Sequence, residues 1–309
     1  MKKCVVIYNP MSGRKKCIKY IPKIMDIIKT YDYEVESIPT EYSGHATVIV
    51  ENLNHVDLVM SIGGDGTFNE VITGNLRRKK KITLSHIPLG TTNDVGKMLG
   101  YGIDPIRNVR MTMDGVVKHI DIPLINGRPF VYVATIGELS DIPYETPSWL
   151  KKKFGYLAYV RQAAFAILER NQVGEIEYEI DGKKYSGKYY LAFVSNSSRI
   201  SGFDNFYRDI KLDDDKFEIL FIKVENFFHV INSLYNISFF DATKIQNADF
   251  FRANNLKIIF KKEPRKPWCI DGEKFDGTPL VYEFRNSSGI NLLMPMKNAN
   301  RLFLKWKRS

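Results

Sequence analysis

The chain has 309 residues, 44% of them hydrophobic and 26% charged, and 45 basic against 35 acidic side chains give a formal net charge of +10. These ordinary fractions exclude a disordered or fibrous chain, and the length predicts two domains. Three scattered cysteines exclude a disulfide framework, and no apolar stretch approaches a membrane span.

The charge and the amino terminus suggest where the protein acts. A basic chain favours anionic partners such as nucleotides, nucleic acid or an acidic membrane face, although the charge can equally serve solubility. The apolar run 4–8 stops at Asn9-Pro10, which is too short for a secretory signal. We therefore expect a cytoplasmic protein.

The first part of the chain alternates strand and helix patterns. Apolar runs predict strands at 4–8, 33–38, 56–60 and 82–87. Helical spacing predicts helices at 18–28, 46–53, 71–76 and 95–99. Loops of small and polar residues follow three of the strands, at 9–13, 63–67 and 88–94. This alternation predicts a parallel sheet covered on both faces, with ligands at the carboxyl ends of its strands.

The pattern changes near residue 116, where short strands and turns begin to dominate. Strands are expected at 117–123, 129–135, 175–180, 184–190, 191–195, 217–224, 256–260, 268–270 and 280–285, with one helix at 227–240. This predicts an antiparallel sandwich or barrel. We place the α/β domain at 1–121 and the second domain at 122–294, with 295–309 able to complete the first. A homodimer is possible, because a strand of the second domain could pair edge to edge with the same strand of another chain.

The segment Ser61-Ile62-Gly63-Gly64-Asp65-Gly66-Thr67 has the composition of a phosphate-binding loop. Glycines let backbone N–H groups approach an anion, and a following helix start adds further donors. Asp65 would repel phosphate unless it meets a metal ion, a hydroxyl or a substrate proton. By itself the motif could be a tight turn, but the two similar loops at neighbouring strand ends strengthen the nucleotide interpretation. For 88–94 the alternative is helix capping by Thr92 or Asn93.

Together these motifs resemble the diacylglycerol kinase catalytic family, with its sphingosine and ceramide kinase relatives. Residues 9–13 resemble the family's Asn-Pro-x-x-Gly loop, and Thr40 with Gly44-His45-Ala46 resembles its Thr…Gly-x-Ala contact. Residues 63–70 match Gly-Gly-Asp-Gly-Thr-x-Asn-Glu, residues 88–94 match Pro-x-Gly-Thr-x-Asn-Asp, and 271–273 resemble the late Asp-Gly-Glu. The resemblance covers nearly the whole chain.

The resemblance implies transfer of the γ-phosphoryl group of ATP to a lipid hydroxyl. It implies a three-layer α/β nucleotide-binding domain, a C-terminal β-sandwich domain and an active site in the cleft between them. Glu273 is the implied proton acceptor, although the dipeptide Asp271-Gly272 by itself favours a surface hairpin turn. Asp65 would face Mg²⁺ or the γ-phosphate. The implied nucleotide-binding residues are Asn9, Pro10, Met11, Ser12, Gly13, Thr40, Gly63, Gly64, Asp65, Gly66, Thr67, Phe68, Asn69, Glu70, Thr91, Asn93 and Asp94.

A structural Mg²⁺ is implied near an Asp-Gly pair of the second domain, where this chain departs from the family. Asp214 matches the acidic ligand, but Asp215 stands where Gly is usual and Lys211 where an acceptor is expected. A charged lysine offers no lone pair to a metal. Asp214 and the Lys216 carbonyl are the remaining ligands, and loss of the site is an equal alternative.

The segment 149–156 interleaves Trp, Phe and Tyr with lysines, which suits either an anionic membrane surface or an amphipathic helix on the core. With the resemblance, this favours a lipid substrate at the inner face of the membrane and no nucleic-acid partner. Diacylglycerol is the expected substrate. The alternatives are a kinase for a sphingoid base or another lipid alcohol, an NAD kinase, and a nucleotide-binding regulator without turnover. The histidines show no metal-ligand spacing, and we expect no catalytic role for them.

Overall fold

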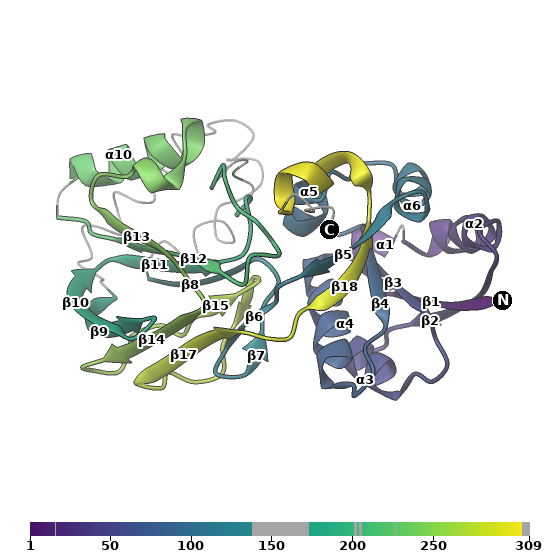
Figure 1. Ribbon diagram of the computed structural model, residues 1–309, viewed down its shortest axis with the longest axis horizontal. Helices are drawn as coiled ribbons and strands as arrows, with labels where there is room; N and C mark the ends of the chain where they lie inside the picture. The colour runs from purple at the N-terminus through teal and green to yellow at the C-terminus, as the bar shows by residue number, and fades with distance from the viewer. Residues whose placement is uncertain (16, 138–172, 201–202, 204–205, 226, 305–309) are drawn as a thin grey trace, which may run out of the picture. The chain divides into compact units, whose positions relative to one another are not determined.

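The computed structural model describes residues 1–15, 17–137, 173–200, 203, 206–225 and 227–304 (Figure 1). It divides into two compact units. Unit 1 contains Met1–Ile122, Lys211–Asp214 and Ser287–Ser309, and unit 2 contains Pro123–Ile210 and Asp215–Asn286. The segment 149–156 lies outside the described residues.

Unit 1 is built on a six-stranded sheet with the order β2-β1-β3-β4-β18-β5. The strands are β1 (Lys2–Tyr8), β2 (Tyr33–Pro39), β3 (Leu58–Gly63), β4 (Thr83–Pro88), β5 (Val116–Ile120) and β18 (Ile290–Met294). β1 to β4 run parallel, and β18 is parallel to β4 but antiparallel to β5. The central strand β3 is buried along its whole length, as a strand covered on both faces must be.

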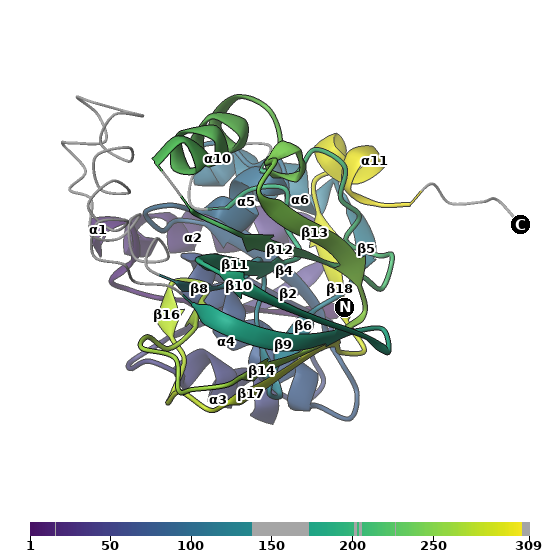
Figure 2. The ribbon, with the colours of Figure 1, turned by 90° about the vertical axis from the view of Figure 1, so that its left-hand side faces the viewer.

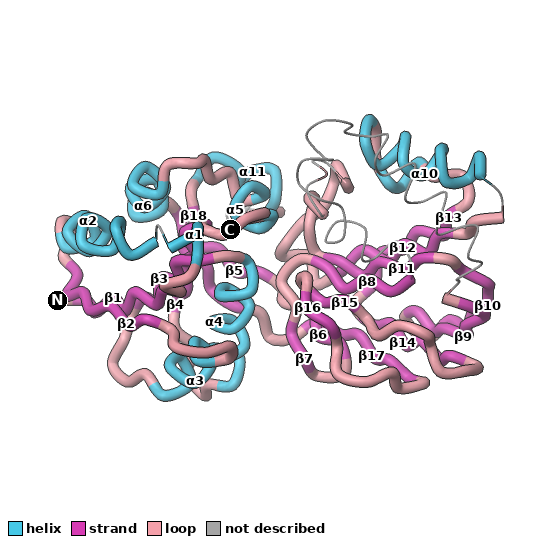
Figure 3. Tube along the Cα trace, turned by 180° about the vertical axis from the view of Figure 1, so that it is seen from behind, coloured by secondary structure: helices cyan, strands magenta, loops and turns pink. Residues whose placement is uncertain are grey.

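Helices cover both faces of this sheet. The helices are α1 (Ser12–Lys15), α2 (Cys17–Lys29), α3 (His45–Asn52), α4 (Asp65–Arg77), α5 (Asp94–Met98), α6 (Pro105–Met113) and α11 (Ala299–Leu302). In Figures 1 and 3, α2 and α6 lie on one face, and α3 and α4 on the other. The isoleucines of α2 explain its packing, because Ile21, Ile24 and Ile28 point into the core while Ile18 is exposed.

Unit 2 is a sandwich of two six-stranded antiparallel sheets (Figure 2). One sheet contains β10 (Lys183–Tyr189), β9 (Gly174–Ile180), β14 (Asn255–Phe260), β17 (Val281–Asn286), β6 (Pro123–Ile125) and β7 (Arg128–Pro129). The other contains β13 (Ala248–Ala253), β12 (Phe217–Ile222), β11 (Leu191–Ser195), β8 (Val133–Gly137), β15 (Cys269–Ile270) and β16 (Glu273–Lys274). Their inner faces share one aromatic-rich core that includes Phe130, Phe217, Trp268, Tyr282 and Phe284. The predicted α/β plus antiparallel-sandwich architecture is confirmed.

Unit 2 also carries a helix, α10 (Phe227–Phe239), which agrees with the predicted helix at 227–240. The elements that were not predicted include β13 in unit 2 and α6 in unit 1. For α6 the sequence does contain a signal, since Asp104 caps its N-terminus and Pro105 occupies its first turn. None of the described helices is long and apolar enough to cross a membrane.

The domain boundaries differ from the prediction at the carboxyl end. The second domain was predicted to extend to residue 294, but β18 belongs to the sheet of unit 1, where it pairs with β4 and β5. Its buried side chains alternate, so the pattern fits a half-buried strand in either sheet. Periodicity identifies a strand but not its neighbour, and the same holds for residues 211–214, which return to unit 1.

Candidate active site

The register of the parallel strands brings the predicted loops to one edge of the unit 1 sheet. Tyr8 is level with Pro39 and Ile62, and Gly63 is level with Pro88. The loops that follow β1, β2, β3 and β4 therefore begin at the same height. This is the edge where open α/β sheets bind their ligands.

Asn9 organises the loop after β1. Its backbone N–H donates to the Ile62 carbonyl at 3.1 Å, which ties the loop to the end of β3. Its side-chain Oδ1 accepts from Met11 N at 2.9 Å, and its carbonyl accepts from Ser12 N at 3.0 Å. The Met11 side chain points to solvent and is 65% exposed. The predicted loop is thus a turn held by its own asparagine.

The motif after β3 starts a helix earlier than predicted. α4 begins at Asp65, so residues 65–70 form its first turns instead of a loop. Gly64 is its N-cap residue and, without a side chain, makes no capping bond. A Cβ on Gly90 would lie 2.5 Å from the Gly64 Cα, so glycine is required where the two loops touch. The backbones after β3 and β4 therefore form one packed surface.

Asp65 connects these two loops. It is buried, and its carboxylate accepts from the backbone N–H groups of Asp94 at 2.9 Å and Val95 at 3.3 Å. These donors belong to the first turn of α5, whose N-cap residue Asn93 makes no capping bond with its side chain. Capping of α5 by the side chain of Asn93, one of the two residues considered for this role, is therefore wrong. A carboxylate from another strand end stabilises the helix start instead.

The side chain of Asn93 serves its own loop. The residue has a φ of 54°, and its amide exchanges hydrogen bonds with Gly90, at 2.7 Å to the Gly90 N–H and 2.9 Å to the carbonyl. Asparagine tolerates this left-handed conformation better than most residues. Thr91 and Thr92 are exposed.

Two other motif residues have structural contacts. The Glu70 carboxylate accepts from Gly44 N at 2.8 Å and Ala46 N at 3.1 Å, and the Glu70 carbonyl accepts from the Thr47 hydroxyl at 2.9 Å. Phe68 is fully buried and stacks on His86 with ring centroids 4.7 Å apart. These contacts place the Phe68 ring in the core and the Glu70 carboxylate at the start of α3.

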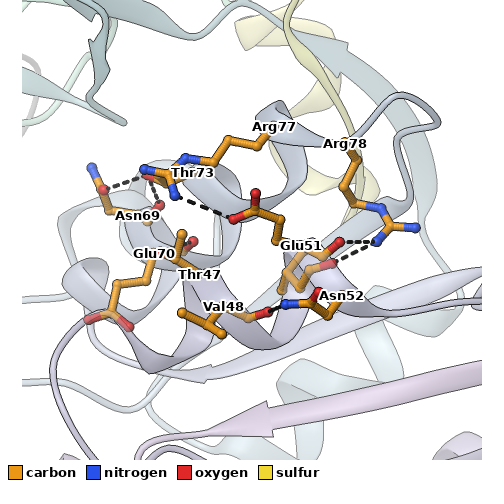
Figure 4. Close-up of polar contacts among 10 residues, drawn as sticks. Thr47, Val48, Glu51, Asn52, Asn69, Glu70, Thr73, Arg77 and Arg78 are labelled. Atoms are coloured by element: carbon orange, nitrogen blue, oxygen red, sulfur yellow. Dashed lines mark hydrogen bonds and ion pairs between the residues drawn. The ribbon is translucent and has the colours of Figure 1, made fainter.

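Figure 4 shows how α3 and α4 lie side by side. At their other end, Arg78 donates to the carbonyls of Val50 at 2.8 Å and Glu51 at 3.0 Å, and Arg77 pairs with the Glu51 carboxylate at 3.4 Å. A guanidinium group on terminal helix carbonyls satisfies acceptors that the helix itself leaves open. Both ends of α3 are thus fixed to α4, which steadies the loop between β2 and α3.

In unit 2, Glu273 follows a tight turn. Asp271 and Gly272 both have positive φ, as a two-residue hairpin turn between β15 and β16 requires. The Asp271 carboxylate fixes this turn by accepting from the N–H groups of residues 131–133 at 2.6 to 3.1 Å. The Glu273 side chain is 60% exposed and pairs with Arg128 at 3.0 Å. A rigid turn therefore presents an exposed carboxylate.

The predicted metal segment is occupied by protein contacts. The Lys211 ammonium donates to the Arg301 carbonyl at 2.6 Å, and the Asp213 carboxylate accepts from Leu304 N at 2.8 Å. In the part of the chain that the structure describes, no group of three or more His, Cys, Asp or Glu side chains could hold a metal. The Lys211 ammonium is a cation without a lone pair, so it does not fit a ligand position of a divalent ion. Asp214 with the Lys216 carbonyl stays a prediction.

This arrangement predicts that the segment is stable without a metal. In nucleotide-free protein, we expect Tm to be the same in MgCl₂, in EDTA and in NaCl of matched ionic strength. Lys211→Met should lower the free energy of unfolding by about 1 kcal/mol, because a charged donor to Arg301 is lost. A saturable Mg²⁺-dependent rise in Tm that Asp214→Asn abolishes would contradict this expectation and restore the metal site.

The buried Ser61–His86 pair was not predicted from the sequence. The Ser61 hydroxyl lies 2.8 Å from His86 Nδ1, and His86 Nε2 has no partner among the described residues. Burial lowers the pKa of the His86 imidazole to about 3, and the bond with Ser61 opposes this only in part. The ring is therefore neutral at physiological pH and acts as a packing group beneath the motif after β3.

His86 should make stability depend on pH. The pKa of the His86 imidazole is lower in the folded than in the unfolded chain. The stability that the neutral imidazole contributes is therefore complete above about pH 6.5 and is lost as the pH falls toward the folded pKa. Between pH 7 and pH 5, we expect the free energy of unfolding to fall less steeply in His86→Phe than in the original protein. The exposed His55 provides the control, since His55→Asn should leave the slope unchanged. Equal slopes for all three proteins would refute the assignment.

Comparison with known proteins agrees with the motif geometry. A sequence profile described as "Diacylglycerol kinase catalytic domain" matches residues 3–125. The chain is 32% identical to the diacylglycerol kinase of Bacillus subtilis strain 168 over 306 residues, which cover 98% of this chain and 99% of that one. It is also 32% identical to the diacylglycerol kinase of Staphylococcus aureus strain RF122 over 227 residues, which cover 73% of this chain and 72% of that one.

The fold agrees with solved structures as well. A crystal structure of a diacylglycerol kinase from Bacillus anthracis strain Sterne superimposes with a TM-score of 0.74 at 21% identity, covering 95% of this chain and 97% of that one. The sheet edge, the motifs gathered along it and the full-length similarity to the B. subtilis enzyme lead to one conclusion. The chain belongs to the diacylglycerol kinase family of lipid-kinase phosphotransferases.

Proposed function

We propose that the protein transfers the γ-phosphoryl group of MgATP to the hydroxyl group of diacylglycerol, which forms phosphatidic acid. The observation that carries this proposal is the packed surface after β3 and β4, where the Gly64 and Gly90 backbones touch and Asp65 joins both loops. Glycine backbones next to a helix start suit phosphate oxygens. A relative that is similar along 98% of this chain is named diacylglycerol kinase.

The proposed nucleotide contacts follow from this edge of unit 1. The turn of residues 9–13, Thr40, residues 63–67, and Thr91 with Asn93 supply the N–H and hydroxyl donors for ATP. Phe68, Asn69 and Glu70 act by positioning these donors. Asp65 holds the start of α5 and brings negative charge near the Mg²⁺ that accompanies ATP, while Asp94 lies buried beside it. Phosphoryl transfer depends mainly on such positioning and charge neutralisation.

The proposed chemistry is an in-line displacement. The lipid hydroxyl oxygen forms a bond to the γ-phosphorus, the bond from that phosphorus to the bridging oxygen breaks, and ADP leaves. Glu273 takes the hydroxyl proton as general base. The Arg128 guanidinium pairs with the Glu273 carboxylate at 3.0 Å and orients the side chain. The exposed position of Glu273 suits a group that must meet a substrate arriving from outside.

We further propose that the protein works from the cytoplasm at the anionic inner face of the membrane. The net charge of +10 supports attraction to acidic headgroups. The three cysteines are free and buried, which suits a reducing compartment. The homodimer stays a prediction.

A lipid panel tests the proposed function. Protein, MgCl₂ and γ-labelled ATP are incubated with mixed micelles that contain diacylglycerol, a sphingoid base, a ceramide or a monoacylglycerol, and with NAD in solution. We expect label in phosphatidic acid. Label only in another lipid product would show that this lipid, and not diacylglycerol, is the substrate. Label only in NADP would refute the assignment as a lipid kinase. No label in any product, with ATP still raising Tm, would favour a regulator without turnover.

A further inference from the structure

At the start of α3, the N–H groups of Gly44 and Ala46 already have a carboxylate acceptor. Both oxygens of the Glu70 carboxylate are used there, on the N–H groups of Gly44 at 2.8 Å and Ala46 at 3.1 Å. The carboxylate also places a negative charge at the start of α3. This charge opposes the binding of an anion at the start of α3.

What this loop does offer is an exposed aromatic surface. The Tyr42 and His45 rings are stacked, with centroids 4.5 Å apart and planes at 11°. Tyr42 is 58% exposed, so one face of its ring is covered by His45 and the other is open. An exposed aromatic ring with a free face is a stacking surface for a planar ligand, and each such stack with a base contributes about 1–3 kcal/mol.

The stacked pair is held in place by the backbone around it. His45 Nδ1 accepts from Glu41 N at 3.1 Å, which closes the turn over the histidine ring. Thr40 N donates to the Tyr8 carbonyl at 2.8 Å and fixes the loop to the end of β1. Because Glu70 holds Gly44 and Ala46 on either side of His45, the histidine is anchored on α4. The ring surface is therefore formed before any ligand binds.

The position of this surface matches the sugar and base end of a nucleotide. In doubly wound sheets the loop after the first binding strand takes the phosphates, and the end of the next strand outward contacts the ribose. Here β3 lies next to β1, with β4 on its other side, and β2 is the edge strand beyond β1. A nucleotide with its phosphates on residues 63–67 can therefore direct its base toward Tyr42.

We infer that Tyr42, backed by His45, is the stacking surface for the purine ring of the nucleotide, with the phosphates bound at the loops after β3 and β4. This deepens the proposed function and rests on its nucleotide site. Stacking does not distinguish the edges of adenine and guanine, so Tyr42 selects purines over pyrimidines and contributes equally to ATP and GTP binding.

Calorimetric titration tests the inference with two ligands that differ only in the nucleoside. ATP probes the phosphate site and the stacking surface, and inorganic tripolyphosphate, also with Mg²⁺, probes the phosphate site alone. In Tyr42→Ala we expect the Kd of ATP to rise about tenfold or more while that of tripolyphosphate is unchanged. Tyr42→Phe should bind ATP like the original protein. In Tyr42→Ala, the binding of GTP should weaken by the same factor as the binding of ATP.

A matched control comes from unit 2, where Tyr185 is also exposed and stacked, on Tyr178 at 5.3 Å. Tyr185→Ala should change neither Kd. ATP binding that is unchanged in Tyr42→Ala, or weakened equally for ATP and tripolyphosphate, would overturn the stacking role and leave the proposed function intact. Failure of the original protein to bind ATP would overturn the nucleotide site, and this inference with it.

Discussion

Asp65→Ala is expected to lower kcat by more than about 100-fold, the range that loss of a well-placed charged group gives. The same change should lower the free energy of unfolding by about 1–3 kcal/mol, because the N–H groups of Asp94 and Val95 lose their buried acceptor. Steady-state kinetics with diacylglycerol and ATP, together with urea denaturation, measure the two effects on the same preparations.

Asp65→Asn separates the charge from the hydrogen bonds. Its amide oxygen can still accept from the start of α5, so we expect most of the stability to be retained while kcat stays low. The control is Asp104→Ala, which removes the cap that accepts from Ile106 N at 2.9 Å and should cost about 1 kcal/mol without changing kcat. A near-normal kcat in Asp65→Asn would remove the carboxylate charge from the mechanism and leave a positioning role only.

Glu273→Gln is expected to lower kcat by about 10²–10⁴-fold, because an amide cannot take the hydroxyl proton. The KM for ATP and the Tm should hardly change, since the side chain is 60% exposed and such ion pairs contribute less than about 1 kcal/mol. The informative result is the contrast with Asp65→Ala, which should lose both activity and stability. Kinetics over a range of ATP concentrations and thermal denaturation measure it.

Glu283 provides a matched control for Glu273. It lies in the same unit, its side chain is 63% exposed, and it pairs with Lys257 at 3.0 Å as Glu273 pairs with Arg128. Glu283→Gln should leave kcat, KM and Tm unchanged. If Glu273→Gln behaved like Glu283→Gln, Glu273 would be an ordinary surface residue of a hairpin, and another group would have to accept the proton.

The two main variants also show which parts of the site sequence reasoning could reach. Gly63 to Glu70 and Pro88 to Asp94 were recognised from residue types and spacing, because a loop between a strand and a helix is a local feature. The contacts within them were not. Asp65 accepts from a residue 29 positions away, and Glu70 from one 26 positions away. Such partners depend on which loops meet in space.

Tertiary structure likewise changed the interpretation of the acidic segment. The sequence placed Lys211 where a metal ligand was expected and left two alternatives open. The contact of its ammonium with the Arg301 carbonyl, 90 residues further along the chain, is not a property of any local pattern. It arises because residues 211–214 pack with the C-terminal segment in unit 1.

The sequence by itself determined the fold class, the order of the motifs and the sheet edge at which they gather. It could do so because hydrophobic periodicity and turn chemistry are local, and because parallel strands end at a common edge. Only the tertiary structure decided that β18 joins the first sheet, that Asp65 caps α5 and that Tyr42 stacks on His45 with one face open. Each of these depends on strand register and packing between segments, which residue spacing does not encode.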